Sequence, residues 1–359
     1  MILCRSSLAV IVFLTLGFAG AALGDSGAAP ETESGDAAVV PDEIVLKNGS
    51  RLLGKVTGVR DASVNFSTDF AGELTIDMDQ VESISTQSPV VMQLADKTVV
   101  REVPLQVEQS EVVIAAGDGM GERKLALDEL LLVNPEPWEL GEGYKWSGQT
   151  SFAWALERGN TDTDELDIFF ESIWRSVLDR YTLKLTSEQD EVNGQRSADN
   201  WLLSGKYDYF ISDGRYWGIF ASAESDEFTD LDLRYLLGPV YGRDFRDDSL
   251  LALSAEVGVA YVNENFIVAE DQDYVSGIWN LKMSSDYLGA DSRLYLTQRG
   301  ILSLDDISDL VIDTTVGLAF PLRWGLEASA ELLLEYDSGA PAGVEDLDQT
   351  YKVRIGYSW

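Results

Sequence analysis

The feature that most constrains the fold is the alternation of apolar and polar side chains in the last twelve residues, Asp348–Trp359. Side chains of an extended strand point to opposite faces in turn, so this segment has one apolar face and one polar or charged face. The apolar face holds Tyr351, Val353, Ile355, Tyr357 and Trp359. A soluble sheet buries such a face beneath a second layer, but the upstream sequence predicts only more strands. We therefore expect lipid to cover this face and Asp348–Trp359 to close a transmembrane β-barrel.

Residues 144–359 repeat this alternation in segments long enough to cross a bilayer at a tilt. The sequence therefore predicts an all-β fold with an antiparallel transmembrane barrel of about 12 strands. The predicted strands are Tyr144–Leu156, Asp164–Ser176, Tyr181–Glu188, Asn200–Ile211, Tyr216–Glu224, Leu233–Arg243, Leu250–Asn263, Tyr274–Tyr287, Arg293–Ile301, Leu310–Pro321, Arg323–Tyr336 and Thr350–Trp359. The inward face of Tyr216–Glu224 is ambiguous from its sequence.

The connections between these strands are predicted to alternate between long outer loops and short inner turns. The long outer loops include Gln189–Asp199, Ser225–Asp232 and Asp337–Gln349, and acidic residues are frequent in the long set and at its edges, Glu224 among them. Aromatic residues at the predicted strand ends suggest girdles at the two membrane interfaces. They are Trp146, Trp201, Tyr207, Tyr209, Trp324, Tyr357 and Trp359.

The segments before the barrel predict export and a second domain. Residues 1–24 contain Arg5, an apolar stretch and a small-residue end, which predicts a signal peptide that removes the only cysteine, Cys4. Residues 25–41 are rich in Gly, Ala, Glu, Asp and Pro and predict a disordered acidic linker. Residues 42–137 predict a water-soluble periplasmic β-domain of two SH3-like or Sm-like units, 42–87 and 88–137, each opening with a hairpin. Asn48-Gly49 predicts a two-residue turn in the first hairpin.

The composition excludes several kinds of function. The net charge of -36 and the absence of a basic stripe exclude nucleic acid as a partner. No histidine is present, and Cys4 leaves with the signal peptide, which removes Ser-His and Cys-His nucleophile pairs and the usual zinc, copper and haem sites. We therefore expect no cofactor, no bound metal of these kinds and no enzymatic activity.

Charged residues on the predicted inner face are the remaining candidates for chemistry. Glu327, Glu331 and Glu335 are spaced to share one face of their strand, and Lys352 and Arg354 occupy the inner face of the last strand. The carboxylates could act as general acid and base only with a raised pKa in a dry pocket. The alternative is that they pair with lumenal Lys and Arg and fill the interior of the barrel. A barrel of twelve strands would then have a narrow or plugged lumen.

Two short motifs carry a resemblance to a known family. Trp146-Ser147-Gly148 and, further along, Gly159-Asn160-Thr161-Asp162-Thr163 resemble the signature of a family of salt-induced outer-membrane proteins of unknown function, domain of unknown function four-eight-one. The resemblance covers Tyr144–Trp359 and implies a location in the outer membrane of a Gram-negative bacterium, but no reaction. Val353, Ile355, Tyr357 and Trp359 resemble the C-terminal signal that is read by the barrel-assembly machinery.

Three functions remain open at this point. The first is an outer-membrane barrel with a role in envelope structure or stress, or a narrow pore for ions or small solutes. The second is a cell-surface binding protein whose acidic loops hold divalent cations or a partner, including a cation bridge to lipopolysaccharide. The candidate cation ligands are Asp162, Asp164, Glu165, Asp230, Asp232, Asp346 and Asp348. The third is a barrel enzyme that uses Glu331.

Overall fold

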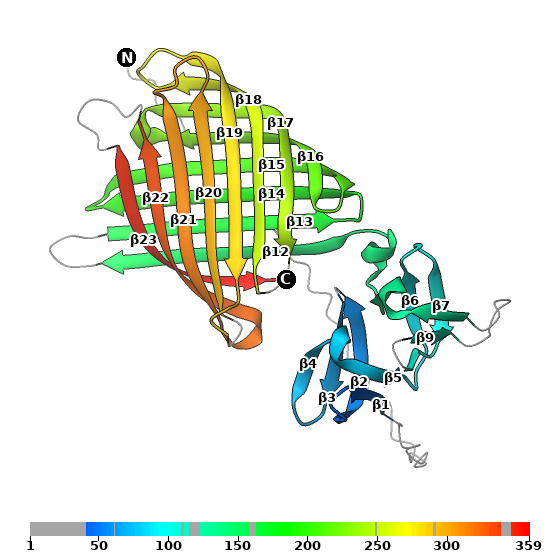
Figure 1. Cartoon of the computed structure of the whole chain (residues 1–359). Helices are drawn as coiled ribbons and strands as arrows, with labels where there is room; N and C mark the ends of the chain where they lie inside the picture. The colour runs from blue at the N-terminus through cyan, green and yellow to red at the C-terminus, as the bar shows by residue number, and fades with distance from the viewer. Residues whose placement is uncertain are drawn as a thin grey trace, which may run out of the picture.

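The structure is a computed structural model that describes residues 41–60, 62–108, 111–114, 123–157, 163–247, 250–289, 292–338 and 346–359. The signal peptide predicted at 1–24 and almost all of the linker predicted at 25–41 lie outside these residues. The described chain forms a curled β-sheet followed by a closed β-barrel (Figure 1). No helix in these ranges is long and apolar enough to cross a membrane.

The first unit is a single eleven-stranded sheet with strand order β10-β9-β8-β5-β1-β2-β11-β6-β7, and β3 and β4 extend from β2. Both predicted units contribute to it and exchange strands: β5 pairs with β8 of the second unit, and β11 pairs with β2 of the first. The elements are β1 (Asp42–Leu46), β2 (Arg51–Arg60), β3 (Ser63–Thr68), β4 (Gly72–Asp77), η1 (Met78–Gln80), β5 (Val81–Ser85), β6 (Val90–Leu94), β7 (Val99–Val103), β8 (Gln106–Glu108), β9 (Glu111–Ile114), β10 (Arg123–Ala126), η2 (Leu127–Glu129) and β11 (Leu130–Val133).

The opening hairpins of the two halves use the same turn. The N–H of Leu46 donates to the carbonyl of Ser50 at 2.9 Å, and Gly49 between them has φ +83°. The N–H of Leu94 donates to Thr98 at 2.9 Å in the same way, and here Lys97 takes the left-handed conformation. The prediction of a two-residue turn at Asn48-Gly49 was wrong, because three residues lie between Leu46 and Ser50 and only the glycine needs positive φ.

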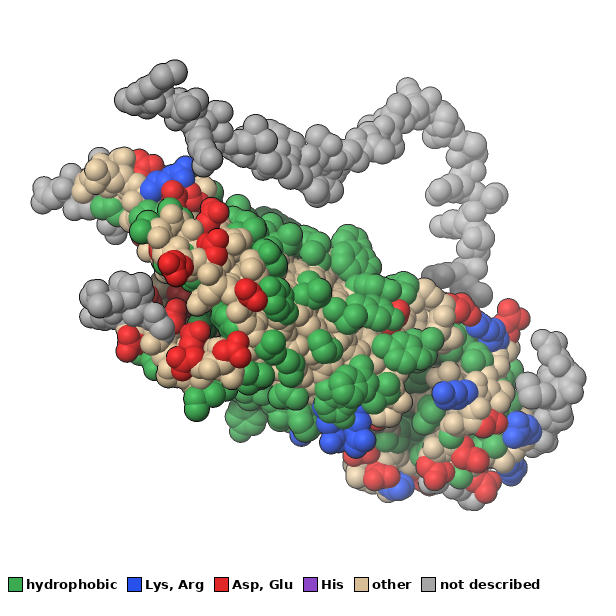
Figure 2. Space-filling model, turned by 90° about the horizontal axis from the view of Figure 1, so that it is seen from above, with side chains coloured by type: hydrophobic (Ala, Val, Ile, Leu, Met, Phe, Trp, Pro, Cys, Tyr) green, Lys and Arg blue, Asp and Glu red, His purple; other side chains and the backbone are tan. Residues whose placement is uncertain are grey.

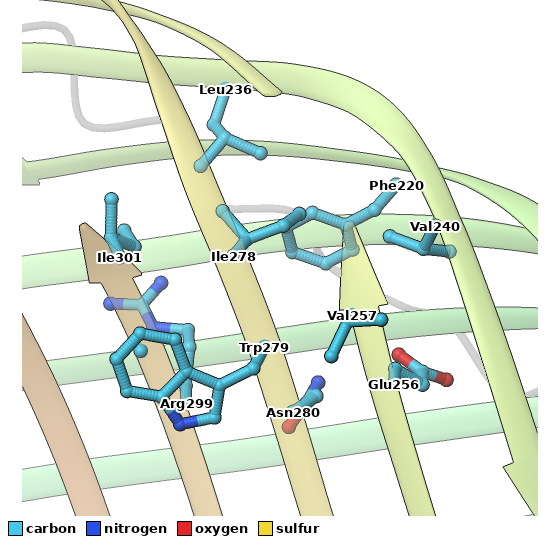
Figure 3. A pocket seen from close by; sticks show the side chains of 11 residues that line it. Phe220, Leu236, Val240, Glu256, Val257, Ile278, Trp279, Asn280, Arg299 and Ile301 are labelled. Carbon is cyan, nitrogen blue, oxygen red and sulfur yellow. The ribbon is translucent and has the colours of Figure 1, made fainter. Parts of the chain in front are cut away.

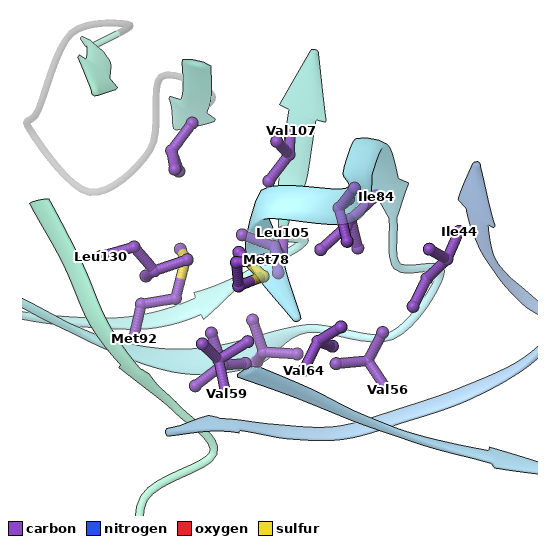
Figure 4. Close-up of a cluster of buried hydrophobic side chains, with 14 of the residues drawn as sticks. Ile44, Val56, Val59, Val64, Met78, Ile84, Met92, Leu105, Val107 and Leu130 are labelled. Carbon is purple, nitrogen blue, oxygen red and sulfur yellow. The ribbon is translucent and has the colours of Figure 1, made fainter. Parts of the chain in front are cut away.

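A common hydrophobic core joins the halves of this sheet (Figure 4). Ile44, Val64 and Ile84 from the first half and Met92 and Val107 from the second are at most 1% exposed and belong to one cluster. Burial of each such side chain stabilises the folded state by about 1.5–3 kcal/mol. Neither half therefore has a complete core of its own.

A short connector leads from the sheet to the barrel and is held to the sheet by ion pairs, of which the pair between Arg60 and Glu139 is the less exposed. It contains η3 (Pro137–Leu140), which begins with proline and ends at Gly141 with φ +82°. Arg60 at the end of β2 donates to both carboxylate oxygens of Glu139, at 3.0 and 2.8 Å. Burial raises the pKa of Glu139, but the hydrogen bonds and charge of Arg60, together with the backbone N–H of Glu136, outweigh it and leave the pKa below its ordinary value.

We expect the connector to loosen in acid. Because the pKa of Glu139 is lower in the folded state, its contribution is complete above the ordinary value of 4.5 and is lost as the pH falls through the lower folded value. Hydrogen–deuterium exchange of residues 134–144, corrected for the intrinsic rate, should rise below this pH in the native protein. Glu139→Gln should remove the pH dependence, and equal pH dependence in both proteins would contradict the assignment.

The second unit is a closed barrel of twelve antiparallel strands in sequence order, as the alternation predicted. Strands that follow each other in sequence are joined by long ladders, such as the thirteen register pairs between β12 and β13. The strands are β12 (Lys145–Glu157), β13 (Thr163–Arg175), β14 (Asp179–Val192), β15 (Gln195–Ser212), β16 (Arg215–Asp226), β17 (Leu231–Asp247), β18 (Ala252–Phe266), β19 (Gln272–Ser285), β20 (Arg293–Ser303), β21 (Leu310–Pro321), β22 (Leu326–Asp337) and β23 (Leu347–Ser358).

The outer surface of the barrel has an apolar belt. Figure 2 shows hydrophobic side chains covering its middle, with acidic side chains gathered at one end and the curled sheet at the other. Large apolar residues of this belt are exposed, such as Ile219 at 56% and Val257 at 59%. Aromatic pairs lie near the end where β12 begins, including Trp217 and Tyr241 with ring centres 5.0 Å apart. This distribution suits a barrel whose belt faces acyl chains.

The predicted connections are partly wrong. Gln189–Asp199 is not a long loop, because β14 and β15 continue to a tight turn at Asn193 and Gly194, both with positive φ. Ser225–Asp232 is also mostly strand, with only η4 (Glu227–Thr229) and Asp230 between β16 and β17. The strands extend further than their apolar stretches because cross-strand hydrogen bonds continue beyond the belt.

Candidate functional site: a charged lumen and its seam

The lumen is lined by alternate residues of the barrel strands, and most of its charged side chains are paired. On β22 the apolar Leu332 and Leu334 face outward, whereas Glu331 and Glu335 face inward. A charge on the lipid face would be destabilising, whereas a lumenal charge can meet a partner. The inward charged residues discussed below are Asp167, Glu171, Arg180, Glu188, Lys206, Asp208, Glu224, Arg234, Glu256, Glu264, Lys282, Arg293, Arg299, Asp313, Glu327, Glu331, Glu335, Lys352 and Arg354.

One enclosed group is centred on Arg234 of β17. Its guanidinium donates to the carboxylates of Glu264 on β18 and Glu224 on β16, the latter at 2.5 Å. Glu264 is 2% exposed and also accepts from Tyr274 at 3.1 Å. Arg299 on β20 reaches Glu224 at 3.1 Å. The prediction that Glu224 belongs to the acidic outer loops is wrong, because the residue lies inside the barrel between Arg234 and Arg299.

A second group lies around Glu256 of β18. Its carboxylate accepts from Lys206 on β15 and from the hydroxyl of Tyr216 at 2.6 Å. Lys206 also lies 3.3 Å from Asp208, and Asp208 accepts from Arg180 at 2.8 Å. Tyr216 is fully buried, which resolves the ambiguous strand: Tyr216, Gly218 and the alternate residues after them point inward.

One ion pair reaches across the lumen. Lys282 on β19 lies 3.4 Å from the carboxylate of Glu171 on β13. These strands are six positions apart in a ring of twelve, so they stand on opposite walls. The side chain of Lys282 is nevertheless 48% exposed, although it projects into the interior. Water-sized space therefore remains around this pair.

The predicted lumenal residues Lys352, Arg354 and Glu331 are part of one cluster. Arg354 donates to both oxygens of Asp167 on β13, at 2.9 and 3.1 Å, and to Glu331 at 2.7 Å. Lys352 lies 2.6 Å from Asp167 and 2.9 Å from Glu188 on β14. The side chains of Arg354 and Lys352 are only 8% and 10% exposed.

The other two predicted glutamates have separate environments. Glu327 accepts two hydrogen bonds from Arg293 at 2.9 and 3.1 Å. Glu335 stands between Asp313 on β21 and Asp348 on β23 in the cross-strand register, so three carboxylates are neighbours there. The three glutamates thus share an inner face but do not converge on one point.

An apolar patch interrupts the polar lining on the wall formed by β16–β21. Phe220, Leu236, Ile278 and Ile301 gather there beside a cavity of about 30 Å³, close to the volume of one water molecule (Figure 3). Glu256, Asn280 and Arg299 complete the lining. The cavity is too small for an organic ligand, but it gives this wall of the lumen an apolar surface.

Trp146-Ser147-Gly148, which resemble the family signature, lie where the barrel closes. The rings of Trp146 and Trp359 meet edge to face with centres 5.6 Å apart. Gly148 and Trp359 exchange two backbone hydrogen bonds, each 3.0 Å long. A Cβ on Gly148 would stand 2.5 Å from Cζ2 of Trp359, so the missing side chain makes room for the ring. Gly159, Asn160, Thr161 and Asp162 lie outside the described residues.

The acidic residues at the outer end mostly stabilise turns. Asp230 accepts from the N–H groups of Val268 and Ala269, both at 2.9 Å, and Asp306 accepts from Ser308. Burial, followed by the carboxylate of Glu264, raises the pKa of Asp309 in the connection after β20. Among the described residues, no group of three or more acidic, histidine or cysteine side chains is arranged to hold a metal ion. Cation binding by these loops stays a prediction.

The geometry defines a class: an outer-membrane-type β-barrel with a lumen lined by paired charges and a preceding β-sheet unit. Residues 150–359, more than half of the chain, match the family described as "Protein of unknown function, DUF481". The chain belongs to this family. The sequence has no significant match among curated proteins.

Solved structures with a similar barrel include three of different kinds. The NanC porin has 10% identity and a TM-score of 0.37, with 60% of this chain and 99% of that chain covered. The translocator domain of the autotransporter NalP from Neisseria meningitidis has 14% identity and a TM-score of 0.34, with 60% and 88% covered. The CymD monoaromatic hydrocarbon channel has 9% identity and a TM-score of 0.31, with 76% and 86% covered. At these values the likeness concerns general barrel architecture alone.

Sequence reasoning missed the acidic partners of the lumenal cations. Asp167, Glu224, Glu256 and Glu264 all occupy inward positions of predicted or extended strands. The alternation within each strand could have placed them on the inner face. It could not have paired Glu171 with Lys282, because facing walls have no fixed separation in sequence.

Proposed function

We propose that the protein is a narrow outer-membrane pore for small ions, with a lumen constricted by the Lys282–Glu171 pair. The observation that carries this proposal is a lysine that meets the opposite wall at 3.4 Å and is still 48% exposed. Such a group narrows the passage without excluding water. The paired lumenal carboxylates favour this pore over a barrel enzyme, because Glu331 is already hydrogen-bonded to Arg354 and Tyr295.

The charges at the outer mouth favour cations. Asp309, Asp306 and Asp230 lie in the connections at this end, beyond the strands. A negative entrance raises the local concentration of small cations. The outward belt supports a location in the outer membrane, and the preceding sheet would then lie in the periplasm because it joins the start of β12 (Figure 1). Lipid, lipopolysaccharide and the barrel-assembly machinery are the partners implied by this location.

The conductance of the refolded protein in planar bilayers tests the pore. We expect small discrete steps in the native protein, and a higher conductance with stronger cation preference for Lys282→Met, because this change removes a positive charge from the constriction. Two unit charges 4 Å apart in water interact by about 1 kcal/mol, so the cation-to-anion permeability ratio should rise by up to about fivefold. Glu171→Gln should also break this ion pair, but it should lower the cation-to-anion permeability ratio because it removes a negative charge.

Arg101→Met is the control, because Arg101 lies in the preceding sheet and its side chain is 53% exposed. It should leave conductance and selectivity unchanged. Absence of discrete steps across a series of salt concentrations would instead leave the barrel with a structural role in the envelope.

A further inference from the structure

The seam between the first and last strands is incompletely paired. β12 and β23 share four register pairs, from Gln149↔Ser358 to Phe152↔Ile355, whereas β12 and β13 share thirteen. Beyond Phe152↔Ile355, the described residues of β12 pair only with β13, and those of β23 pair only with β22. Two strand edges therefore face each other without a ladder.

The apolar residues beside this split are unusually exposed for strand residues. Trp154 on β12 is 69% exposed, and Tyr351 and Val353 on β23 are 78% and 72% exposed. Val257 on β18, which has a paired strand on each side, is 59% exposed. The outward residues at the split thus lack the neighbour that a complete ladder would provide.

The split lies at the level of the outer leaflet. A tilted barrel strand advances roughly 2.5 Å per residue along the membrane normal, so the seven steps from Lys145 to Phe152 span roughly 18 Å of a belt about 25 Å tall. Unpaired backbone groups in lipid cost several kcal/mol each, so an edge at this depth needs another partner.

Ion pairs close the split from inside where the ladder ends. Arg354 is the first residue of β23 beyond the last register pair, and Lys352 is the next inward residue. Both reach past β12, Arg354 to Asp167 on β13 and Lys352 to Asp167 and Glu188 on β14. The β23 side of the split is therefore lined by two cations whose partners are side chains and can be exchanged.

We propose that the split is a lateral opening between the lumen and the outer leaflet that admits an amphipathic molecule with an anionic headgroup. The acyl chain would lie against Trp154, Tyr351 and Val353, and the headgroup phosphate or carboxylate would replace the partners of Arg354 and Lys352. The apolar wall around Ile278 and Ile301 stands on the other side of the lumen and offers a second apolar surface. This route is lateral and does not depend on ion conduction along the barrel axis.

A disulfide test measures the split directly. Cys4 is the only cysteine of the chain, so engineered pairs can be followed without background from the described residues. Phe152→Cys with Ile355→Cys, within the ladder, should oxidise readily. Trp154→Cys with Val353→Cys, the next outward pair, should not, because disulfides form only with Cα atoms about 4.4–6.8 Å apart. Equally rapid oxidation of both pairs would overturn the proposal, and so would a disulfide between two copies through Trp154→Cys.

Quenching by brominated lipid identifies the occupant. A fluorophore on Thr350→Cys, on the inner face of β23 beyond the ladder, should be quenched by phosphatidylglycerol with brominated acyl chains in reconstituted vesicles. The matched label on Thr297→Cys, inward on β20 with complete ladders on both sides, should not be quenched. Brominated phosphatidylcholine should quench Thr350→Cys several-fold less, and Lys352→Gln with Arg354→Gln should abolish this difference. Equal quenching by both lipids in the native background, or none by either, would overturn the proposal.

Discussion

Arg234→Met is expected to lower the free energy of unfolding of the barrel by about 3–5 kcal/mol, because it leaves buried carboxylates without a counter-charge. Glu264 is 2% exposed and would lose its arginine, and Glu224 would keep only Arg299. The measurement is urea-induced unfolding in phospholipid vesicles, followed by tryptophan fluorescence and by the gel mobility of unheated samples.

Two further variants separate charge from packing. Glu264→Gln in the Arg234→Met background should recover part of the loss, because it removes the unpaired charge that the first substitution created. Arg293→Met should cost less, since the side chains of Arg293 and Glu327 are 36% and 27% exposed and water can solvate what remains. An additive loss for the double variant would contradict the pairing described here.

Gly148→Val is expected to prevent normal closure of the barrel. Its Cβ would overlap the carbonyl oxygen of Glu171 and approach the ring of Trp359, and the first of these is backbone that cannot rotate away. Overpacking of this kind costs about 1–3 kcal/mol, and more where backbone has to move. The yield of folded, heat-modifiable protein after refolding into vesicles measures the effect.

Gly205→Ala on β15 is the matched control. Nothing lies within 4 Å of a Cβ at this position, so the variant should refold like the native protein. If Gly148→Val refolded as well as Gly205→Ala, the contact between the first strand and Trp359 would not be required for closure.

The sequence predicted the barrel well, because side chains that alternate along each strand contact lipid on one face and the polar lumen on the other. Each of the twelve predicted strands overlaps an observed one. Glu331 and Arg354 point into the barrel, and their sequence neighbours Leu332 and Val353 point outward, as the alternation predicted. The ends of strands were less predictable, since hydrogen bonding continues past the apolar belt. The dipeptide Asn193-Gly194 could have predicted the tight turn between β14 and β15, because Asn-Gly favours positive φ in such turns.

The candidate site was only partly predictable. The alternation along a strand shows which side chains point into the lumen, but not which strands face each other across it. The contact between Glu171 and Lys282 could therefore be found only from the closed barrel. The length of the β12/β23 ladder was also hidden, because both strands alternate regularly past the point where Phe152 and Ile355 end their pairing. The sequence also did not predict the strand exchange in the first unit. When two repeats have similar strands, the sequence does not show whether a strand pairs within its own repeat or with the other one.

The exchange of β5 and β11 between the two halves has a consequence for how the chain must be made. Neither half can complete its sheet until both have been synthesised, so residues 42–87 would keep an open β-edge until the rest of the unit follows. Chaperones that bind extended segments would stay bound longest at this stage. A chain break near residue 88 would leave two fragments that are stable only as a complex.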